Sequence, residues 1–297
     1  MANKYQAPLG ASLVVFSSVF YASYGIWTKL IGNYFDGFTA TVFRSILVVA
    51  ILLPIAIFRH SLQPIRWKDN WRYIFGAFAT GLLTWGTLWF AILQAGLGVS
   101  LTVTYASIVI GQFFFGWLFA GEKFTKDKAI SAILGFTGLA LIFAPSTRVV
   151  GLMALLAAFV SGLCTAANTV FAKQIKYNAT QSTIVMWTTG VVANMIMVAV
   201  LHRHYPALAW DIQWLYLVVF SVASVIASWS LVSGVKLIDA GAAGVLGLLE
   251  IVFGVLFGIV LFHERPGLVV LVGALVILAA AAIPYMKDYN AQRGTLD

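Results

Sequence analysis

The stretch GVLGLLEIVFGVLFGIVLFHER, residues 244–265, is an apolar run interrupted by a single glutamate, Glu250. The run is long enough to cross a bilayer, which takes about 20 apolar residues in a helix. A carboxylate at bilayer depth costs several kcal/mol unless another group stabilises it or it takes up a proton. Glu250 therefore lies outside a membrane or has a task inside one.

The composition decides between these alternatives. Of the 297 residues, 61% are hydrophobic and 9% are charged, and the mean hydropathy is +0.95. Soluble domains carry roughly 25% charged residues, so this chain has too few polar groups to cover a surface in water. We therefore expect an all-α integral membrane protein, with the lipid bilayer as its main solvent.

Other classes of protein are disfavoured by the same composition. The basic residues behind the net charge of +8 are scattered through short loops, which argues against a nucleic-acid-binding patch. The single cysteine, Cys164, excludes an internal disulfide and a structural cysteine-cluster metal site. No P-loop motif is present, so we do not expect ATP hydrolysis. We expect no cofactor.

Ten apolar segments have the length of a membrane span. We place them at about 9–31, 37–58, 72–94, 98–120, 127–145, 149–173, 180–201, 213–235, 240–262 and 266–286. An even number of spans puts both termini on one side. With cytoplasmic termini, most basic loop residues face the cytoplasm and only Lys29, Arg148, Arg203 and Arg265 face outward, as the positive-inside rule requires. We expect a multi-pass protein of the cell membrane.

The two halves of the chain repeat each other. FAGEKF at 119–124 and LFHERP at 261–266 both follow a glycine-spaced apolar span, and aligning Glu122 with Glu264 also pairs Gly116 with Gly258. In the first and sixth spans, an offset of 144 residues pairs Lys29 with Lys173. Because each half holds an odd number of spans, the second repeat (148–297) is inverted in the membrane relative to the first (1–147).

This arrangement resembles the EamA-like branch of the drug/metabolite transporter superfamily. The resemblance rests on ten spans in two repeats, on the arginine in ATVFRSILVV (Arg44), and on the GE and HE endings of the glycine-spaced helices. It implies a secondary transporter whose substrate site lies near the midplane between the repeats. The family often has Glu-Pro about fourteen residues before the terminal glutamate. Here Glu250 holds that place, and Ile251 replaces the proline that breaks a helix.

Glu250 is the candidate ion-binding residue, since it is the acidic residue well inside a span. Gly247, Gly254 and Gly258 lie near one face of the same helix, and small residues of this kind, like Gly116 in the first repeat, let helices pack closely. We therefore expect Glu250 to border the interior of the bundle. Either it exchanges protons during transport, or neighbouring hydroxyls hold it as a structural group; we favour proton exchange.

Arg44 is the basic residue well inside a span. It has several alternative roles. It can pair with Glu250, bind an anionic group of the substrate, extend its charged end to the outer membrane surface, or bond loop carbonyls as a structural anchor. We favour the structural anchor.

Polar stripes on the first, third, sixth and eighth spans, together with nearby aromatic residues, predict an inner cavity. Any single hydroxyl of this kind more often bonds its own helix or a neighbouring one. The candidate substrate-binding residues are Tyr21, Tyr24, Trp27, Thr84, Trp85, Trp89, Tyr105, Thr165, Asn168, Ser224 and Ser228. An aromatic cavity favours a planar or amphipathic small molecule.

The expected function is export of small metabolites by alternating access, with amino acids, including aromatic and bulky ones, as the favoured substrates and protons as a coupling ion. Organic cations, drugs and nucleotide sugars are alternative cargoes. A lipid scramblase or a non-transporting membrane component is the rival from another class. We do not expect an enzyme, because no second acid or histidine within a span accompanies Glu250.

Overall fold

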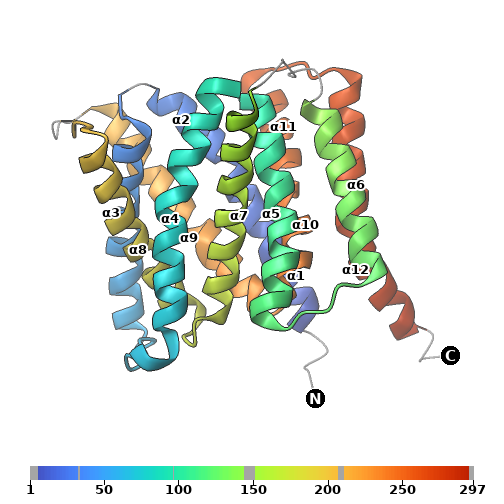
Figure 1. The fold of residues 1–297 in the computed structure, drawn as a ribbon, viewed down its shortest axis with the longest axis horizontal. Helices are drawn as coiled ribbons and strands as arrows, with labels where there is room; N and C mark the ends of the chain where they lie inside the picture. Colours follow the sequence, from blue (N-terminus) through green and yellow to red (C-terminus); the bar gives the residue numbers. More distant parts are fainter. Residues whose placement is uncertain (1–5, 33, 96, 144–150, 207–210, 294–297) are drawn as a thin grey trace.

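The computed structural model describes residues 6–32, 34–95, 97–143, 151–206 and 211–293, and these form helices and short connections. The expected boundary between the repeats, at 147/148, lies outside them. Figure 1 shows the helices running side by side. They are α1 (Gln6–Ala22), α2 (Tyr24–Ile31), α3 (Gly37–Phe58), α4 (Trp67–Ala95), α5 (Leu97–Ala120), α6 (Lys126–Phe143), α7 (Leu152–Gln174), α8 (Ala179–Val200), α9 (Ile212–Val235), α10 (Ala240–Gly247), α11 (Leu249–Phe262) and α12 (Leu268–Arg293).

These helices make ten membrane spans, as predicted. Eight stretches are apolar and long enough to cross a membrane, counting α1 with α2 and α10 with α11 as one stretch each. Two more helices complete the ten: α6, which begins with a charged turn, and the apolar part of α12, Leu268–Ile283. The start of α1 and the end of α12 lie on the same side of the bundle (Figure 1). We call this the terminal side and the opposite side the far side.

Two of the spans are interrupted by one residue whose backbone remains in the right-handed helical region, and we call each such position a break. The first breaks at Ser23, whose hydroxyl donates to the carbonyl of Phe20 at 2.6 Å. The ninth breaks at Leu248, where the backbone N–H bonds the carbonyl of Val245 at 3.2 Å, three residues back instead of four. The second break occurs without a proline, directly before Glu250, and thus places that carboxyl in the first turn of a new helix.

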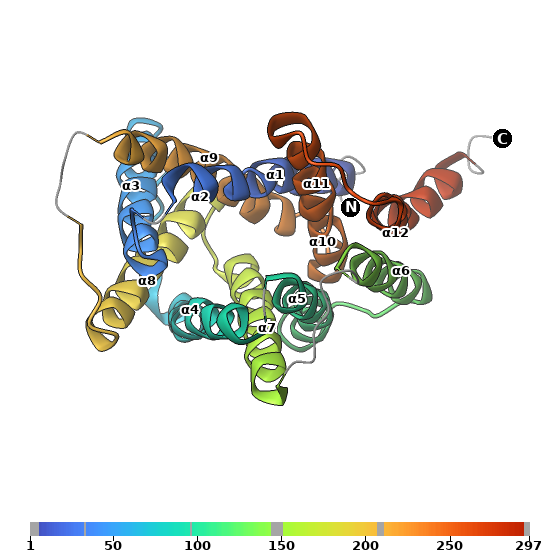
Figure 2. The ribbon, with the colours of Figure 1, turned by 90° about the horizontal axis from the view of Figure 1, so that it is seen from above.

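Helix pairing follows the inverted repeat. α1 packs along α9, and its counterpart α7 packs along α4; α3 packs with α8, and α6 with α12. Figure 2 shows the α3–α8 pair at one end of the molecule and the α6–α12 pair at the other. Equivalent caps begin the second span of each half: Asp36 accepts from the N–H of Thr39 at 3.2 Å, and Asn178 accepts from the N–H of Gln181 at 2.8 Å.

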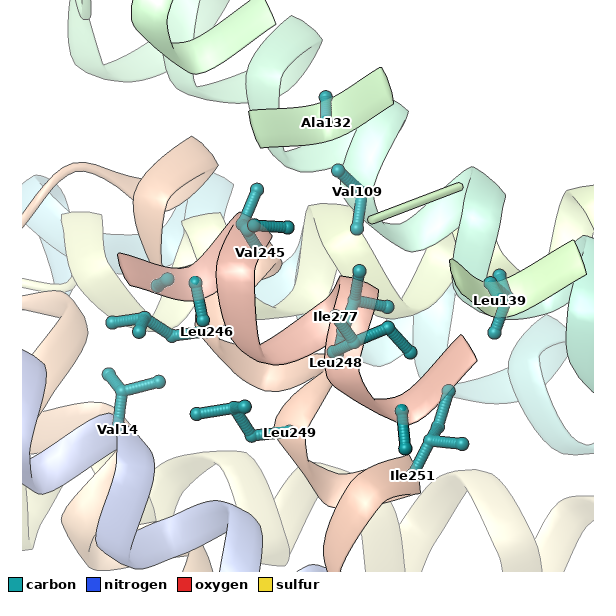
Figure 3. Close-up of a cluster of buried hydrophobic side chains, with 14 of the residues drawn as sticks. Val14, Val109, Ala132, Leu139, Val245, Leu246, Leu248, Leu249, Ile251 and Ile277 are labelled. Atoms are coloured by element: carbon teal, nitrogen blue, oxygen red, sulfur yellow. The ribbon is translucent and has the colours of Figure 1, made fainter. Parts of the chain in front are cut away.

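A buried apolar cluster holds the broken ninth span in place. Figure 3 shows side chains of α10 and α11 enclosed by residues from α1, α5, α6 and α12. Leu248, at the break itself, is 1% exposed, and Val109 and Ile277 pack in the same cluster. One face of the break is therefore covered by packed side chains, and this packing holds the start of α11, which carries Glu250, in place.

Candidate functional site

Glu250 is bound by a tyrosine of the other repeat. The hydroxyl of Tyr105, on α5, donates to Oε1 of Glu250 at 2.8 Å. Both side chains are partly buried, and α5 and the α10–α11 span are equivalent helices of the two repeats. The hydrogen bond therefore joins the two halves at the place where the chain carries its intramembrane carboxyl.

The face of the span that carries Glu250 borders open space. Gly247 and Gly254 stand three residues before and four residues after Glu250, on the same helix face. A Cβ built on either glycine would meet no atom within 4 Å. Close packing is found instead at Gly116 and Gly258, where a Cβ would stand 2.6 Å and 2.5 Å from the carboxylates of Glu122 and Glu264, respectively. Gly247 and Gly254 therefore lie beside the candidate site, whereas Gly116 and Gly258 leave room for the carboxylates that follow the ends of their helices.

Arg44 of α3 lies in the interior, 5% exposed, inside a group of aromatic rings. Its guanidinium carbon is 4.5 Å from the ring centre of Phe220, 5.0 Å from Tyr24, 5.5 Å from Trp187 and 5.8 Å from Trp85. These rings come from α2, α4, α8 and α9. They place the positive charge at the meeting point of four spans.

Tyr21 connects the two charged positions. Its ring lies 5.1 Å from the ring of Tyr24. Its phenol is close enough to interact electrostatically with both the carboxyl of Glu250 and the guanidinium of Arg44. Tyr21, Tyr24, Trp85, Tyr105 and Glu250, all predicted from the sequence, therefore form one neighbourhood with Arg44.

The polar stripes of α4 and α7 bond each other. The hydroxyl of Ser161 donates to the carbonyl of Thr84 at 2.8 Å, and Nδ2 of Asn168 donates to the carbonyl of Ala77 at 3.1 Å. Thr165 bonds the carbonyl of Ser161, one turn back in its own helix, at 3.0 Å. In this conformation, the side chains of Ser161 and Asn168 hold α7 against α4, whereas the hydroxyls of Thr84 and Thr165 bond their own helices.

The remaining candidates lie around this neighbourhood. Ser224 and Ser228 are buried and bond carbonyls of α9, and Ser228 also accepts from Nε1 of Trp187 at 2.8 Å. Trp27 donates to the hydroxyl of Ser23 at 3.2 Å and packs in an apolar cluster of the far side. Trp89 is 41% exposed, and its ring lies beside α3.

The repeats carry matched lysine–glutamate pairs on opposite sides. On the terminal side, Nζ of Lys173 is 2.5 Å from Oε1 of Glu122, and the side chains are 17% and 9% exposed. On the far side, Nζ of Lys29 is 2.9 Å from Oε1 of Glu264, and the side chains are 57% and 55% exposed. Each pair joins the two repeats, and it is enclosed on the terminal side but open to its surroundings on the far side.

The terminal-side pair is bonded to more of the protein. Both carboxylate oxygens of Glu122 accept from the N–H of Ala240, at 2.9 and 2.8 Å, which caps the start of α10. Lys173 also donates to the carbonyl of Ile238 at 2.7 Å. Nearby, burial and then the ammonium of Lys173 lower the pKa of Lys236, just beyond α9, to about 8.

Sequence reasoning missed two parts of this arrangement. Phe220, the ring nearest to Arg44, lies one turn before Ser224 on the same helix face, so the serine stripe contained the signal. Lys173 and Glu122 were identified as repeat markers, but their pairing was not predicted. It depends on α5 and α7 ending beside each other, which the three-dimensional packing decides.

Comparison with known proteins agrees with this architecture. The model of the EamA-like transporter family matches residues 8–144 and again residues 152–286. The chain belongs to the EamA-like transporter family. A relative described as an uncharacterized transporter of Helicobacter pylori is 22% identical over 264 residues, which cover 85% of this chain and 86% of that protein. This EamA-like chain also shares the fold of a protein of known crystal structure at a TM-score of 0.76, with 18% identity, over 95% of this chain and 98% of the other.

Proposed function

We propose that this membrane transporter is a secondary carrier that works by alternating access and exports small metabolites, with amino acids, including aromatic and bulky ones, as its substrates. In this proposal both termini are cytoplasmic, in the cell membrane, and protons are coupled through Glu250. The observation that carries it is the asymmetry between the two lysine–glutamate pairs. The interior neighbourhood of Arg44, Glu250 and the aromatic rings supplies the substrate site.

One enclosed and one exposed lysine–glutamate pair are what we expect of a single conformational state of an inverted-repeat carrier. In such carriers the two repeats exchange their conformations as the protein alternates between states. The buried pair Lys173–Glu122 closes the terminal side by fixing the start of α10. In the opposite state, Glu264 would close the far side by taking the corresponding place at the start of α5, and Glu122 would be released. In the present state, the exposed Lys29–Glu264 pair marks the open far side, and the buried Lys173–Glu122 pair marks the closed terminal side.

A matched pair of substitutions tests this mechanism. Glu122→Gln removes the charge of a nearly buried carboxylate, whereas Glu264→Gln alters an exposed pair, which contributes about 0–1 kcal/mol. In a Cys164→Ala background, Ala240→Cys reports on the terminal side, because Ala240 is 0% exposed. We expect Glu122→Gln to raise the rate at which a membrane-impermeant thiol reagent reacts with Cys at position 240 by about tenfold or more. This corresponds to a loss of at least ~1.4 kcal/mol from the free energy that favours the closed terminal side.

The control is Glu264→Gln, which should not raise that rate, because its exposed ion pair lies on the far side and Glu264 makes its closing contact only in the opposite state. An equal rise with both substitutions, or no rise with Glu122→Gln, would contradict the alternating closure of the two sides.

Counterflow in liposomes that contain the purified protein tests the carrier itself. Amino acids, organic cations and nucleotide sugars would each be offered with and without an imposed pH gradient. We expect saturable uptake of an aromatic or bulky amino acid. Passage of lipid probes without saturable uptake of any solute would overturn the proposal in favour of a scramblase.

A scramblase needs a polar groove that is open to lipid. Among the described residues, the side groove between α1, α3, α8 and α9 has a volume of about 400 Å³ and is mostly apolar, which favours the carrier. Its lining consists of Phe16, Leu52, Ile55, Val225, Ile226 and Trp229 with the polar residues Arg59, Ser61, Thr180 and Ser230.

A further inference from the structure

Arg44 is a buried cation without an acidic partner. Within the described part of the chain its guanidinium makes neither an ion pair nor a hydrogen bond, and its Nε is enclosed with no acceptor. A buried charge normally has a counter-charge and hydrogen bonds, because the loss of its hydration costs several kcal/mol. The Nε–H of Arg44 is thus enclosed without an acceptor, and its other four N–H donors make no hydrogen bond to the described residues.

The aromatic rings around Arg44 compensate only part of this cost. A cation over a ring face gains about 0.5–2 kcal/mol, and four rings lie within 5.8 Å of the guanidinium carbon. Rings, however, accept no strong hydrogen bonds in the plane of the guanidinium. A structural anchor, the role that the sequence favoured, would bond helix or loop carbonyls, and Arg44 has no such bond among the described residues.

The surroundings identify the missing group as the anionic end of a small molecule with an apolar body. A guanidinium binds carboxylates through two parallel N–H···O bonds, which satisfy the donors that rings cannot. Trp85, Trp187 and Phe220 offer ring surface directly beside this position. Tyr24 completes the group of rings around the guanidinium.

We propose that Arg44 binds the carboxylate of the transported molecule, and that the substrate class is therefore aromatic or bulky carboxylates, amino acids among them. The inference rests on the proposed carrier function and specifies its substrate. It replaces the structural role of Arg44 with a role in recognition.

Three matched probes separate the contribution of each charge. L-phenylalanine carries both charged groups, 3-phenylpropionate lacks the amine, and 2-phenylethylamine lacks the carboxylate. Binding to the purified full-length protein would be measured by calorimetry. We expect Arg44→Gln to weaken both carboxylate-containing probes by about thirtyfold or more, the usual effect of removing one member of a desolvated charge pair. Its effect on 2-phenylethylamine should be less than about threefold.

The matched control is Arg59→Gln, which removes the exposed arginine that follows the end of the same helix. It should change the affinity for none of the three probes. If Arg44→Gln does not fold, the wild-type protein decides the question, because 3-phenylpropionate should bind at least about thirtyfold more tightly than its neutral analogue 3-phenylpropionamide. Equal binding of acid and amide, failure of both carboxylates to bind the wild-type protein, or equal weakening of all three probes by Arg44→Gln would overturn the inference.

Counterflow distinguishes this inference from the carrier proposal. Saturable counterflow together with binding that does not depend on the carboxylate would overturn the role of Arg44 and leave the carrier in place. Binding of carboxylates that depends on Arg44, without counterflow of any bound probe, would overturn the carrier proposal and support the site.

Discussion

Replacing Glu250 with glutamine should abolish the response of transport to an imposed pH gradient. Glutamine has nearly the same shape as glutamate and its amide oxygen can still accept from the hydroxyl of Tyr105, which now lies 2.8 Å from Oε1. It cannot take up or release a proton, so coupling is lost while the fold is kept. Carboxyl groups within membrane spans typically serve in proton relays.

Two transport assays separate coupling from binding in this variant. Accumulation of an aromatic amino acid driven by the pH gradient should fall by about tenfold or more, to the level reached without a gradient. A tenfold fall in the concentration ratio corresponds to a loss of ~1.4 kcal/mol of driving free energy. Counterflow without a gradient exchanges substrate for substrate with no net movement of protons, and it should continue.

The control is Tyr105→Phe, which removes the hydrogen bond and keeps the carboxyl. This variant should still respond to the gradient. A Glu250→Gln protein that transports with an unchanged pH dependence would show that Glu250 is a structural residue and that coupling, if present, lies elsewhere.

Replacing Gly162 with alanine should destabilise the folded protein by about 1–3 kcal/mol, the cost of placing an extra methyl group in a packed core. Gly162 lies where α7 crosses α5. A Cβ there would stand 2.0 Å from Oγ of Ser107 and 2.2 Å from the carbonyl oxygen of Thr104, so the two helices would have to separate. Tyr105 follows Thr104 directly, and the separation would also displace the tyrosine that binds Glu250.

Gly254→Ala is the matched control, because a Cβ at that glycine meets no atom within 4 Å. Alanine has a higher helix propensity than glycine by about 1 kcal/mol. The control should therefore be as stable as the unchanged protein or more stable. Thermal unfolding of both variants in the same detergent measures the difference. Equal midpoints for Gly162→Ala and the unchanged protein would contradict the close crossing.

The spans were predictable from the sequence because they depend on local composition. The second predicted span, 37–58, has the bounds of α3, and the fourth, 98–120, begins one residue after α5. The third begins at Trp67 rather than at 72, because the amphipathic turn before the apolar run continues the same helix. Apolar length sets where a helix crosses lipid, whereas polar turns at its ends are weaker signals.

Side-chain partners were predictable only in part. Glu250, Tyr21, Tyr24, Trp85 and Tyr105 were selected as intramembrane acid and aromatic residues, and they lie around one neighbourhood with Arg44. Thr84, Thr165 and Asn168 had the same appearance in the sequence, yet their polar atoms join α4 to α7 or bond their own helix. A hydroxyl on a helix face has the same pattern whether it faces a cavity or a neighbouring helix.

By itself, the sequence determined that the chain is helical, that it crosses a membrane ten times and that its halves repeat, because these properties follow from local apolar length and from self-similarity. The tertiary structure alone decided the rest. It interrupts the ninth span at Leu248 without a proline, and it encloses Lys173–Glu122 while exposing Lys29–Glu264. It also leaves Arg44 among aromatic rings, with no ion pair to an acid in the described part of the chain. Each of these depends on which helix packs beside which, and side chains distant in sequence meet only through that packing.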